Sequence, residues 1–152
     1  MDDGHQMDYS QITDNIFVGS NLCKGNVCPI HGPEFKKLNI TVEINLTREH
    51  EEIAPKALDL YAWIPVTDKG VPDACQFGLS TSIINEAVIN NQRVYIHCKN
   101  GHGRSPTVVA AYLIRFQKMN VTDAVNLIKS KRAEIHLEEG QLEALNKFAQ
   151  KQ

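Results

Sequence analysis

One segment of the chain, residues 93–117, constrains the fold more than any other. It begins with an apolar run that predicts a strand at Arg93–His97. Residues 98–103 follow with two glycines and predict a loop. Ser105 and Pro106 then predict the start of a helix, with Ser105 as its cap and Pro106 at the first helical position. This helix is apolar almost all round, so we expect it to be the buried central helix of an α/β domain.

The rest of the chain alternates strands and helices at first and is helical later. Runs of β-branched and aromatic residues predict strands, and Asp or Asn with a polar residue three positions on predicts a helix start. The expected elements are strands at Asn15–Gly19, Ile40–Leu46 and Tyr61–Val66, a short helix at Pro33–Leu38, helices that begin near Asp73 and Asn120, and a C-terminal helix through Leu142–Phe148. We therefore expect a small central sheet flanked by helices, with Tyr61–Val66 as a buried strand.

Length and charge limit what this domain can be. At 152 residues the chain is expected to form one domain over residues 1–152, with residues 1–8 as a flexible polar tail. The formal net charge of −2 excludes a global basic field, so we expect no nucleic-acid partner. The longest apolar run, Val108–Ile114, is far shorter than the ~20 residues of a membrane span. We expect a monomer with one core and no membrane-spanning segment.

The cysteines indicate a compartment. Four are too few for a disulfide scaffold, so we expect a reduced, intracellular and cytoplasmic protein with free thiols. Cys23 and Cys28 form a Cys-x4-Cys-x2-His cluster with His31, but a zinc site needs about four ligands and no fourth is evident. The favoured interpretation is that these are ordinary loop side chains. We expect no metal site and no cofactor.

The loop after the predicted strand has the composition of an anion-binding site. Its backbone N–H groups can converge on one point, and the following helix start adds N–H groups and the positive end of its dipole. Arg104, directly after the loop, can bind two oxygens of a phosphate with its planar guanidinium. The loop residues expected to bind substrate are Lys99, Asn100, Gly101, His102 and Gly103.

Cys98 lies at the base of this predicted cradle. Helix N-termini and nearby cations lower the pKa of a cysteine from about 8.5 to about 3.5–7.5, which favours a thiolate. A thiolate beneath a bound phosphate is placed for in-line attack on phosphorus, which would form a phosphocysteine. Arg104 and the N–H groups would stabilise the transition state, and the Ser105 hydroxyl could help the sulfur leave in a second step. The sequence thus predicts nucleophilic catalysis on a phosphate ester.

These residues also match a known pattern. The order His97-Cys98, five residues, Arg104-Ser105 resembles the signature of the cysteine-dependent protein tyrosine phosphatases. The small size and the continuation after Ser105 resemble the atypical dual-specificity branch, and residues 11–20 resemble its first strand, so the resemblance covers nearly the whole chain. It implies the dual-specificity phosphatase fold, with the phosphate loop between a strand and the central helix. It also implies hydrolysis of phosphotyrosine and of phosphoserine or phosphothreonine in proteins.

The resemblance implies a general acid as well. The family uses an aspartate about thirty residues before the cysteine to protonate the leaving oxygen. Asp68 matches this spacing, whereas Asp73 has the spacing of a helix cap; the resemblance favours Asp68 and leaves Asp73 as the alternative. In the family the histidine before the cysteine, here His97, tunes the thiolate through hydrogen bonds. Lys99 and His102 either reach a second acidic group of the substrate or face water.

A charged stretch follows the strand predicted at 40–46. It contains Glu43, Arg48, Glu49, Glu51 and Glu52, and its composition is typical of a solvated loop. In the family this region borders the active-site cleft, so the resemblance implies that it could influence the choice of substrate.

Three alternative functions can be compared with a protein phosphatase: a lipid phosphatase, a phosphate-binding module and a sulfurtransferase. A phosphoinositide or phospholipid phosphatase would use the same loop, although such relatives often carry several lysines in the loop, whereas this chain has only Lys99 there. A phosphate-binding module without turnover is disfavoured because Cys98, Arg104, Ser105 and Asp68 are all present. A sulfurtransferase also uses a loop cysteine, but the spacing to Arg104 fits a phosphatase better. We expect a phosphoprotein substrate, with a phospholipid as the alternative.

Overall fold

The computed structural model describes residues 7–22 and 31–152. Its strands form a five-stranded sheet in the order β1-β2-β5-β3-β4. The strands are β1 (Tyr9–Gln11), β2 (Ile16–Gly19), β3 (Ile40–Thr47), β4 (Leu60–Val66) and β5 (Arg93–His97), and the helices are α1 (His31–Leu38), α2 (Ala74–Ile89), α3 (Arg104–Gln117), α4 (Val121–Lys131) and α5 (Glu139–Gln150). The expected α/β fold with a small sheet flanked by helices is confirmed.

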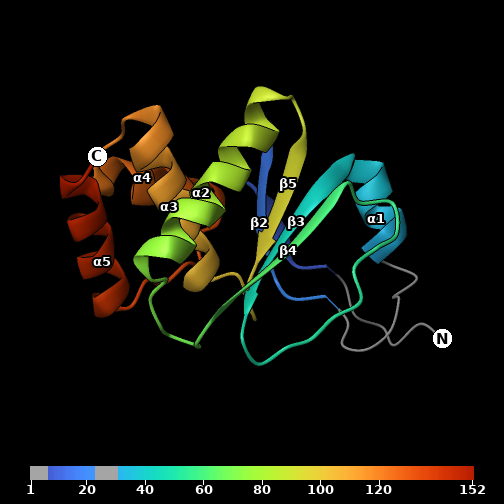
Figure 1. Cartoon of the computed structure of the whole chain (residues 1–152), viewed down its shortest axis with the longest axis horizontal. Helices are drawn as coiled ribbons and strands as arrows, with labels where there is room; N and C mark the ends of the chain where they lie inside the picture. The colour runs from blue at the N-terminus through green and yellow to red at the C-terminus, as the bar shows by residue number, and fades with distance from the viewer. Residues whose placement is uncertain (1–6, 23–30) are drawn as a thin grey trace.

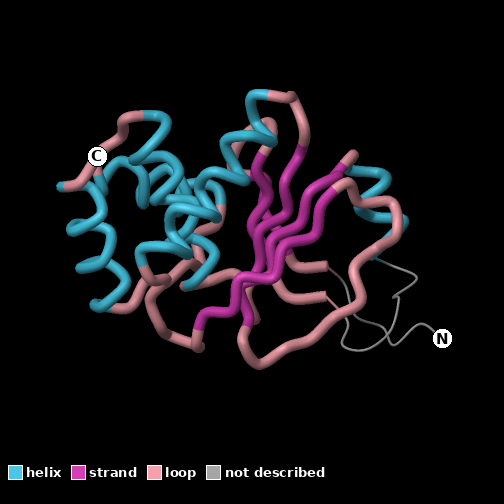
Figure 2. Tube along the Cα trace, viewed as in Figure 1, coloured by secondary structure: helices cyan, strands magenta, loops and turns pink. Residues whose placement is uncertain are grey.

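The direction of the strands brings their ends together. Strands β2, β5, β3 and β4 run parallel, and β1 pairs antiparallel with β2. The carboxyl ends of the parallel strands therefore share one edge of the sheet, the lower edge in Figure 1. Helices α2–α5 lie on one side of the sheet and α1 lies on the other (Figures 1 and 2). In sheets of this kind, ligands bind in the loops at the carboxyl ends of the strands.

The predicted helix caps at Asp73 and Asn120 are confirmed. The Asp73 carboxylate accepts a hydrogen bond of 2.8 Å from the backbone N–H of Gln76, whose side chain accepts one from the Asp73 N–H. Asn120 caps α4 by accepting a bond of 2.8 Å from the Asp123 N–H. Among the elements of the described residues, the short β1 alone has no counterpart among those expected, because three residues are too few to show a periodic pattern.

The strand predicted at Tyr61–Val66 is confirmed as β4, but the prediction that it is buried is wrong. β4 is an edge strand that pairs only with β3, and its Leu60 and Trp63 are 43% and 45% exposed. Ile64 and Val66 are buried against the helices. A continuous apolar run predicts a strand covered on both faces, but at the edge of this sheet only one face is fully covered.

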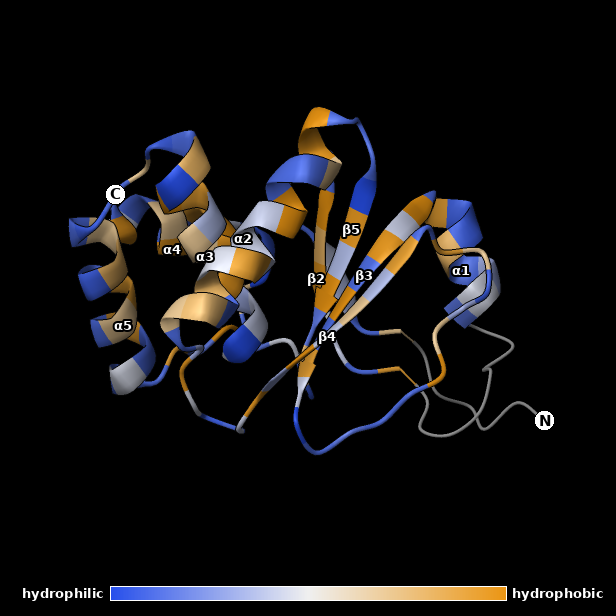
Figure 3. Ribbon diagram, in the orientation of Figure 1, coloured by the Kyte–Doolittle hydropathy of each residue, from blue (hydrophilic) through white to orange (hydrophobic). Residues whose placement is uncertain are grey.

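Apolar side chains pack in two clusters, one on each face of the sheet. The larger lies between the sheet and α2–α5, and all residues of α3 from 104 to 114 are buried in it or at its border, as expected of the central helix. The smaller contains Phe17, Phe35 and Tyr95 and lies beneath α1. Figure 3 shows the hydrophobic residues along the strands and on helix faces turned toward the sheet. Burial on both faces makes the end of β5 a rigid support for the loop that follows it.

The N-terminal segment is anchored where it is described. Residues 1–6 of the predicted flexible tail lie outside the described residues. The carboxylate of Asp8 accepts hydrogen bonds of 3.0 and 3.2 Å from Arg132, so Asp8 is not part of such a tail. No helix in the described part of the chain is both long and apolar enough to cross a membrane.

Candidate active site

The loop at residues 98–103 borders a cleft of about 230 Å³ at the carboxyl edge of the sheet. The cleft brings Cys98 and Arg104, at the two ends of the loop, together with Asp68, which follows β4 and is distant in the sequence. Its other lining residues come from the phosphate loop, the turn after β4, the segment between α4 and α5, and α5 itself: Lys69, Lys99, Asn100, His102, Gly103, His136, Glu138 and Gln141.

The carbonyl groups of residues 99–103 all accept hydrogen bonds from other parts of the protein. The acceptor oxygens and their donors are Lys99 with the Asn21 N–H at 3.2 Å, Asn100 and Gly101 with Arg132 at 2.9 Å each, His102 with the His136 N–H at 2.7 Å, and Gly103 with the Thr107 N–H at 3.0 Å. The peptides are trans, so each N–H points opposite to the preceding C=O. The N–H groups of residues 100–104 therefore point away from these donors, and the Gly101 N–H binds the Cys98 sulfur at the base of the cleft. Convergent N–H groups of this kind bind an anion.

Arg132 is the residue that sequence reasoning missed in this arrangement. It follows α4, it is 1% exposed, and its guanidinium binds the carbonyl oxygens of Asn100 and Gly101. Asp8 accepts two hydrogen bonds from it and Ser10 accepts a third at 3.1 Å. An arginine at the end of a helix has no distinctive local pattern, because the same position suits a solvated cation near a helix C-terminus.

Gly101 is required by both conformation and space. Its φ is +71°, and a Cβ at this position would lie 2.7 Å from the backbone of Gly19 in β2. Any other residue would be strained and would push the loop away from the sheet. The glycine thus lets the loop pack directly on the strand that supports it.

Cys98 is buried at the end of β5 with its sulfur 3.3 Å from the Ser105 hydroxyl oxygen. Burial alone would raise the pKa of the Cys98 thiol. The hydrogen bonds from the side chain and N–H of Ser105, the charge of Arg104 and the N–H of Gly101 outweigh burial and lower that pKa below its ordinary value. The environment thus favours a thiolate at the base of the cleft.

The prediction that Ser105 caps α3 is wrong. The helix begins at Arg104, Gly103 is at the cap position, and no side chain caps the helix end. Ser105 lies inside the first turn, and its hydroxyl faces the Cys98 sulfur. In this first turn the Ser105 N–H binds the Cys98 sulfur and Pro106 has no N–H, so the Arg104 N–H is the group of the turn that is left for an anion.

Arg104 is held in place by Glu49 from the loop after β3. The two side chains pair in a bidentate manner, with N–O distances of 2.7 and 2.8 Å, and Nη1 also donates to the Val66 carbonyl at 2.8 Å. The Arg104 hydrogen bond lowers the pKa of Glu49 to about 2. These bonds use three of the five guanidinium N–H groups, and the remaining two, on Nε and Nη2, lie on one edge and can bind a phosphate.

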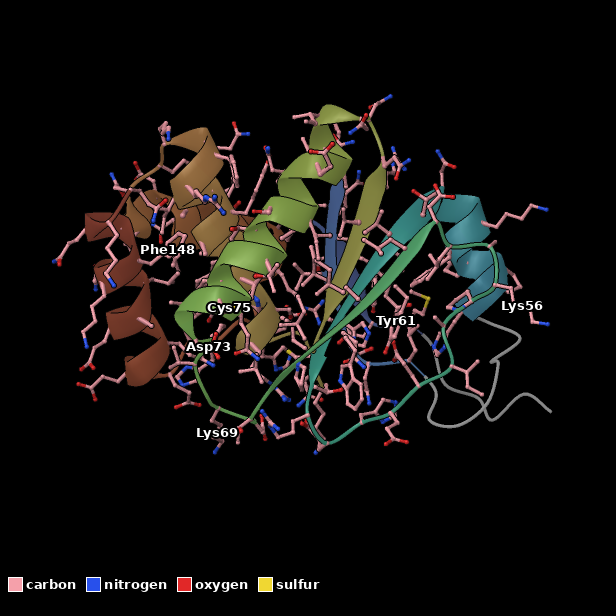
Figure 4. All side chains as sticks on the ribbon, in the orientation of Figure 1. Lys56, Tyr61, Lys69, Asp73, Cys75 and Phe148 are labelled. Carbon is pink, nitrogen blue, oxygen red and sulfur yellow. The ribbon has the colours of Figure 1, made fainter. Side chains whose placement is uncertain are left out.

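Asp68 and Asp73 occupy different places after β4. Asp68 lines the cleft, and its Oδ1 lies 3.3 Å from Nη2 of Arg104. Gln141 of α5 donates a bond of 3.0 Å to the Gly70 carbonyl and holds this turn. The Asp73 carboxylate caps α2; Figure 4 shows it at the helix start, with Lys69 on the preceding turn. The geometry favours Asp68 as the proton donor.

His97 is fully buried behind Cys98. Its Nε2 lies 2.9 Å from Oε1 of Glu43 and 3.0 Å from Oε1 of Glu52. Glu43 is on β3, and Glu52 is on the loop between β3 and β4. The interpretation of this charged stretch as a solvated loop is therefore wrong for Glu43, Glu49 and Glu52, which contact residues of the phosphate loop or its borders.

Two groups of described residues have spacing suited to a metal ion. One is Glu43, Glu52 and His97, whose separations are those of hydrogen bonds. The other is Asp8, His102 and Glu134, where the Arg132 guanidinium already lies beside both carboxylates. Of the predicted Cys-x4-Cys-x2-His cluster, Cys23 and Cys28 lie outside the described residues, and His31 is buried in α1.

Comparison with known proteins identifies a family. The sequence profile of the dual specificity phosphatase catalytic domain matches residues 25–151. A protein of Invertebrate iridescent virus 6 named as a tyrosine phosphatase is 30% identical over 93% of this chain and 92% of its own length. An Arabidopsis thaliana protein named as a phosphatidylglycerophosphate phosphatase is 29% identical over 95% of this chain, which spans 64% of that protein. The crystal structure of a mouse protein described as a dual specificity phosphatase superposes with a TM-score of 0.84 at 20% identity, over 99% of this chain and 92% of the other.

Proposed function

The chain belongs to the dual specificity phosphatases, a family of cysteine-dependent phosphatases, and we propose that it hydrolyses phosphotyrosine and phosphoserine or phosphothreonine in proteins. The observation that carries the proposal is the arrangement around Cys98. A sulfur whose pKa is lowered stands beneath the inward N–H groups of residues 100–104 and beside Arg104. Such a site binds a phosphate and places a nucleophile under it.

The first step transfers the phosphoryl group to the enzyme. The Cys98 thiolate attacks phosphorus, a P–S bond forms, and the P–O bond to the alcohol or phenol breaks. The protonated Asp68 gives its proton to the leaving oxygen. Arg104, fixed by Glu49, and the loop N–H groups bind the equatorial oxygens, whose negative charge they stabilise in the transition state.

The second step releases phosphate. The Asp68 carboxylate takes a proton from a water molecule, the water oxygen attacks phosphorus, and the P–S bond breaks. The Ser105 hydroxyl, 3.3 Å from the sulfur, donates a hydrogen bond to the departing thiolate. Because a thiolate nucleophile must stay reduced to act, we also propose a reducing, intracellular compartment.

Replacing the nucleophile tests this mechanism. Cys98→Ser should bind tungstate or phosphate about as tightly as the wild type and lose at least about a thousandfold in kcat, because an alcohol is a poor nucleophile here. Rapid quenching of the wild type with a labelled aryl phosphate should trap one phosphoryl group on Cys98. Turnover by Cys98→Ser near the wild-type rate would refute the proposal.

A phospholipid phosphatase is the second candidate. The cleft is lined not only by Lys99 and His102 of the loop but also by Lys69 and His136 from neighbouring segments. These groups could bind a second acidic group, such as the phosphodiester of a phospholipid. The Arabidopsis relative named as a phosphatidylglycerophosphate phosphatase supports this alternative.

Matched substrates distinguish the two candidates. We would compare kcat/KM for a phosphotyrosine peptide, a phosphothreonine peptide and phosphatidylglycerophosphate or phosphoinositide in mixed micelles, with Cys98→Ser as the blank. A protein phosphatase should favour the peptides. A lipid phosphatase should favour the micelles and lose about tenfold of that activity in Lys99→Ala, because a charged hydrogen bond is lost. Lys129→Ala, on the exposed side of α4, is the matched control.

A further inference from the structure

Three buried side chains behind the nucleophile form a cluster with no assigned role in the steps above. His97, Glu43 and Glu52 are each 0% exposed at the side chain. One imidazole nitrogen, Nε2, lies about 3 Å from a carboxylate oxygen of each glutamate. The other, Nδ1, lies 3.4 Å from the carbonyl oxygen of Cys98. The ring therefore stands between two acids and the backbone of the nucleophile.

The hydrogen-bond partners determine the protonation of the ring. A carbonyl oxygen can only accept, so Nδ1 must carry a proton to bind Cys98, and Nε2 must carry one to bind whichever of the two acids is ionised. Both nitrogens are then protonated, and the ring is a cation. Burial would lower the pKa of His97, but the hydrogen bonds and charges of Glu43 and Glu52 raise it to about 10.

The two acids cannot both be ionised around a single cation. Their Oε1 atoms are both near the same nitrogen, and each has an Oε2 atom that is buried without a hydrogen-bond partner. Burial raises the pKa of Glu43. Burial acts in the same direction on Glu52, but hydrogen bonds from His97 and Glu43 lower its pKa overall. The cluster therefore holds one imidazolium, one carboxylate and one protonated carboxyl at neutral pH.

The groups around the cluster do not supply a competing charge. Tyr61 of β4 and Tyr95 of β5 have raised pKa values because of burial, so both stay neutral in the physiological range. His50, on the same loop as Glu52, favours the ionised form of Glu52. On the far side of Cys98 lie Ser105 and Arg104, which already favour the thiolate.

We propose that Glu43 and Glu52 are positioning residues for Cys98: together they hold His97 as an imidazolium that binds the Cys98 carbonyl and presents positive charge behind the thiolate. The inference rests on the proposed role of Cys98 as nucleophile. The carboxylate is on the far side of the ring, so Cys98 meets the positive end of the ion pair. Glu52 also ties the loop after β3 to one end of the phosphate loop, as Glu49 ties it to the other.

Either glutamate alone can serve as the counter-ion of His97, and this redundancy predicts a distinctive pattern of effects in the single and double variants. In Glu52→Gln the remaining Glu43 can ionise and pair with His97, and in Glu43→Gln the ionised Glu52 stays in place. Each single variant should therefore change the thiolate little. In the double variant the buried imidazolium has no counter-ion and loses its proton, so the apparent pKa of Cys98 should rise by about one unit, a tenfold loss of thiolate below that pKa. The effects of the two changes should be strongly non-additive.

Alkylation of Cys98 reads the thiolate without any substrate. The rate of iodoacetamide reaction would be followed from pH 4.5 to 9 by mass spectrometry of the peptide containing Cys98, so that the other cysteines do not interfere. The variants are Glu43→Gln, Glu52→Gln and their combination, with the exposed neighbour Glu51→Gln as matched control. The pH dependence of kcat/KM on an aryl phosphate should shift its acid limb upward by the same amount in the double variant alone.

Each outcome has one meaning. An unshifted alkylation profile in the folded double variant, or a loss of rate that is equal at every pH, would overturn the inference and leave a structural role for the cluster. A midpoint near that of an ordinary thiol in the wild type would instead refute the proposed nucleophile itself. If the double variant does not fold, the ¹⁵N shifts of the histidine ring in the wild type decide: a His97 ring that is neutral at pH 7 overturns the inference.

Discussion

Replacing Arg132 by methionine should both destabilise the fold and weaken anion binding. Methionine keeps a long stem that can fill the buried site but has no N–H donor. The carbonyl oxygens of Asn100 and Gly101 would lose the Arg132 donors that bind them, and the Asp8 carboxylate would lose its Arg132 partner. The peptides between residues 100 and 102 would then be free to turn their N–H groups away from the cleft.

The cost can be estimated bond by bond. The Gly101 oxygen is buried, so leaving it without a donor costs about 1–3 kcal/mol. Asn100 is exposed and its oxygen can be rehydrated, so that bond contributes about 1 kcal/mol. Asp8 is 59% exposed at the side chain, and screening by water limits its pair to less than about 1 kcal/mol. The sum is a loss of about 3 kcal/mol in the free energy of unfolding.

Two assays measure these effects separately. Urea denaturation gives the free energy of unfolding, and calorimetric titration with tungstate gives anion affinity, which should fall about tenfold or more as the N–H groups lose their orientation. Lys131→Met, at the exposed end of α4 one residue earlier, is the matched control and should change neither quantity. A stability loss below about 1 kcal/mol together with unchanged tungstate affinity would refute the argument that Arg132 orients the loop.

Three further substitutions test other parts of the site. Asp68→Ala should slow the hydrolysis of alkyl phosphates about a hundredfold or more, slow that of activated aryl phosphates much less, and flatten the basic limb of the pH–rate profile. Asp73→Ala should lower the stability by about 1 kcal/mol through its lost cap and leave that limb intact. The reverse result would assign the general acid to Asp73. Gly101→Ala should destabilise the protein by about 1–3 kcal/mol in chemical denaturation, while Gly78→Ala in α2, where a Cβ meets nothing within 4 Å, should not; equal effects would contradict the close-approach argument. Glu49 has a folded pKa of about 2, below its unfolded value, so its contribution is present above about pH 4.3 and is lost as the pH falls toward 2. Glu49→Gln should therefore reduce the thermal stability at neutral pH slightly and flatten its decline over that acid range. The effect is at most about 1 kcal/mol because the Glu49 side chain is 42% exposed. If the melting temperatures of the variant and the wild type ran parallel across this pH range, the pair would add no stability.

Local patterns predicted the elements best where the determining residues are close in the chain. The caps at Asp73 and Asn120 and the strand–loop–helix unit around Cys98 depend on contacts within a few residues, so they can be recognised without the fold. Ser105 shows the limit of such reasoning. A serine near a helix start suits a cap, but the helix begins one residue earlier and the hydroxyl turns to Cys98.

The alternation of polar and apolar residues in β3 does not reveal what covers each face of the sheet. In β3 the polar side chains Thr41, Glu43 and Asn45 alternate with apolar ones, which is typical of a sheet with one solvated face. The structure covers that face with α1 and the loop that carries Glu52, so Glu43 is buried against His97. An acidic residue in such a strand has the same local pattern whether water or a buried histidine is its partner.

The sequence by itself determined that a cysteine follows a strand and precedes a glycine-containing loop, an arginine and a buried helix. That order is local and sufficient to indicate a phosphate cradle and the family. Only the tertiary structure decided which charged side chains hold the cradle, because those partners are distant in the chain: Arg132 and Asp8 are 124 residues apart, Arg104 and Glu49 are 55, and His97 and Glu43 are 54. A long charged side chain can be solvated by water instead, and only the packing of the strands and loops around the site excludes water and brings these partners within hydrogen-bond distance.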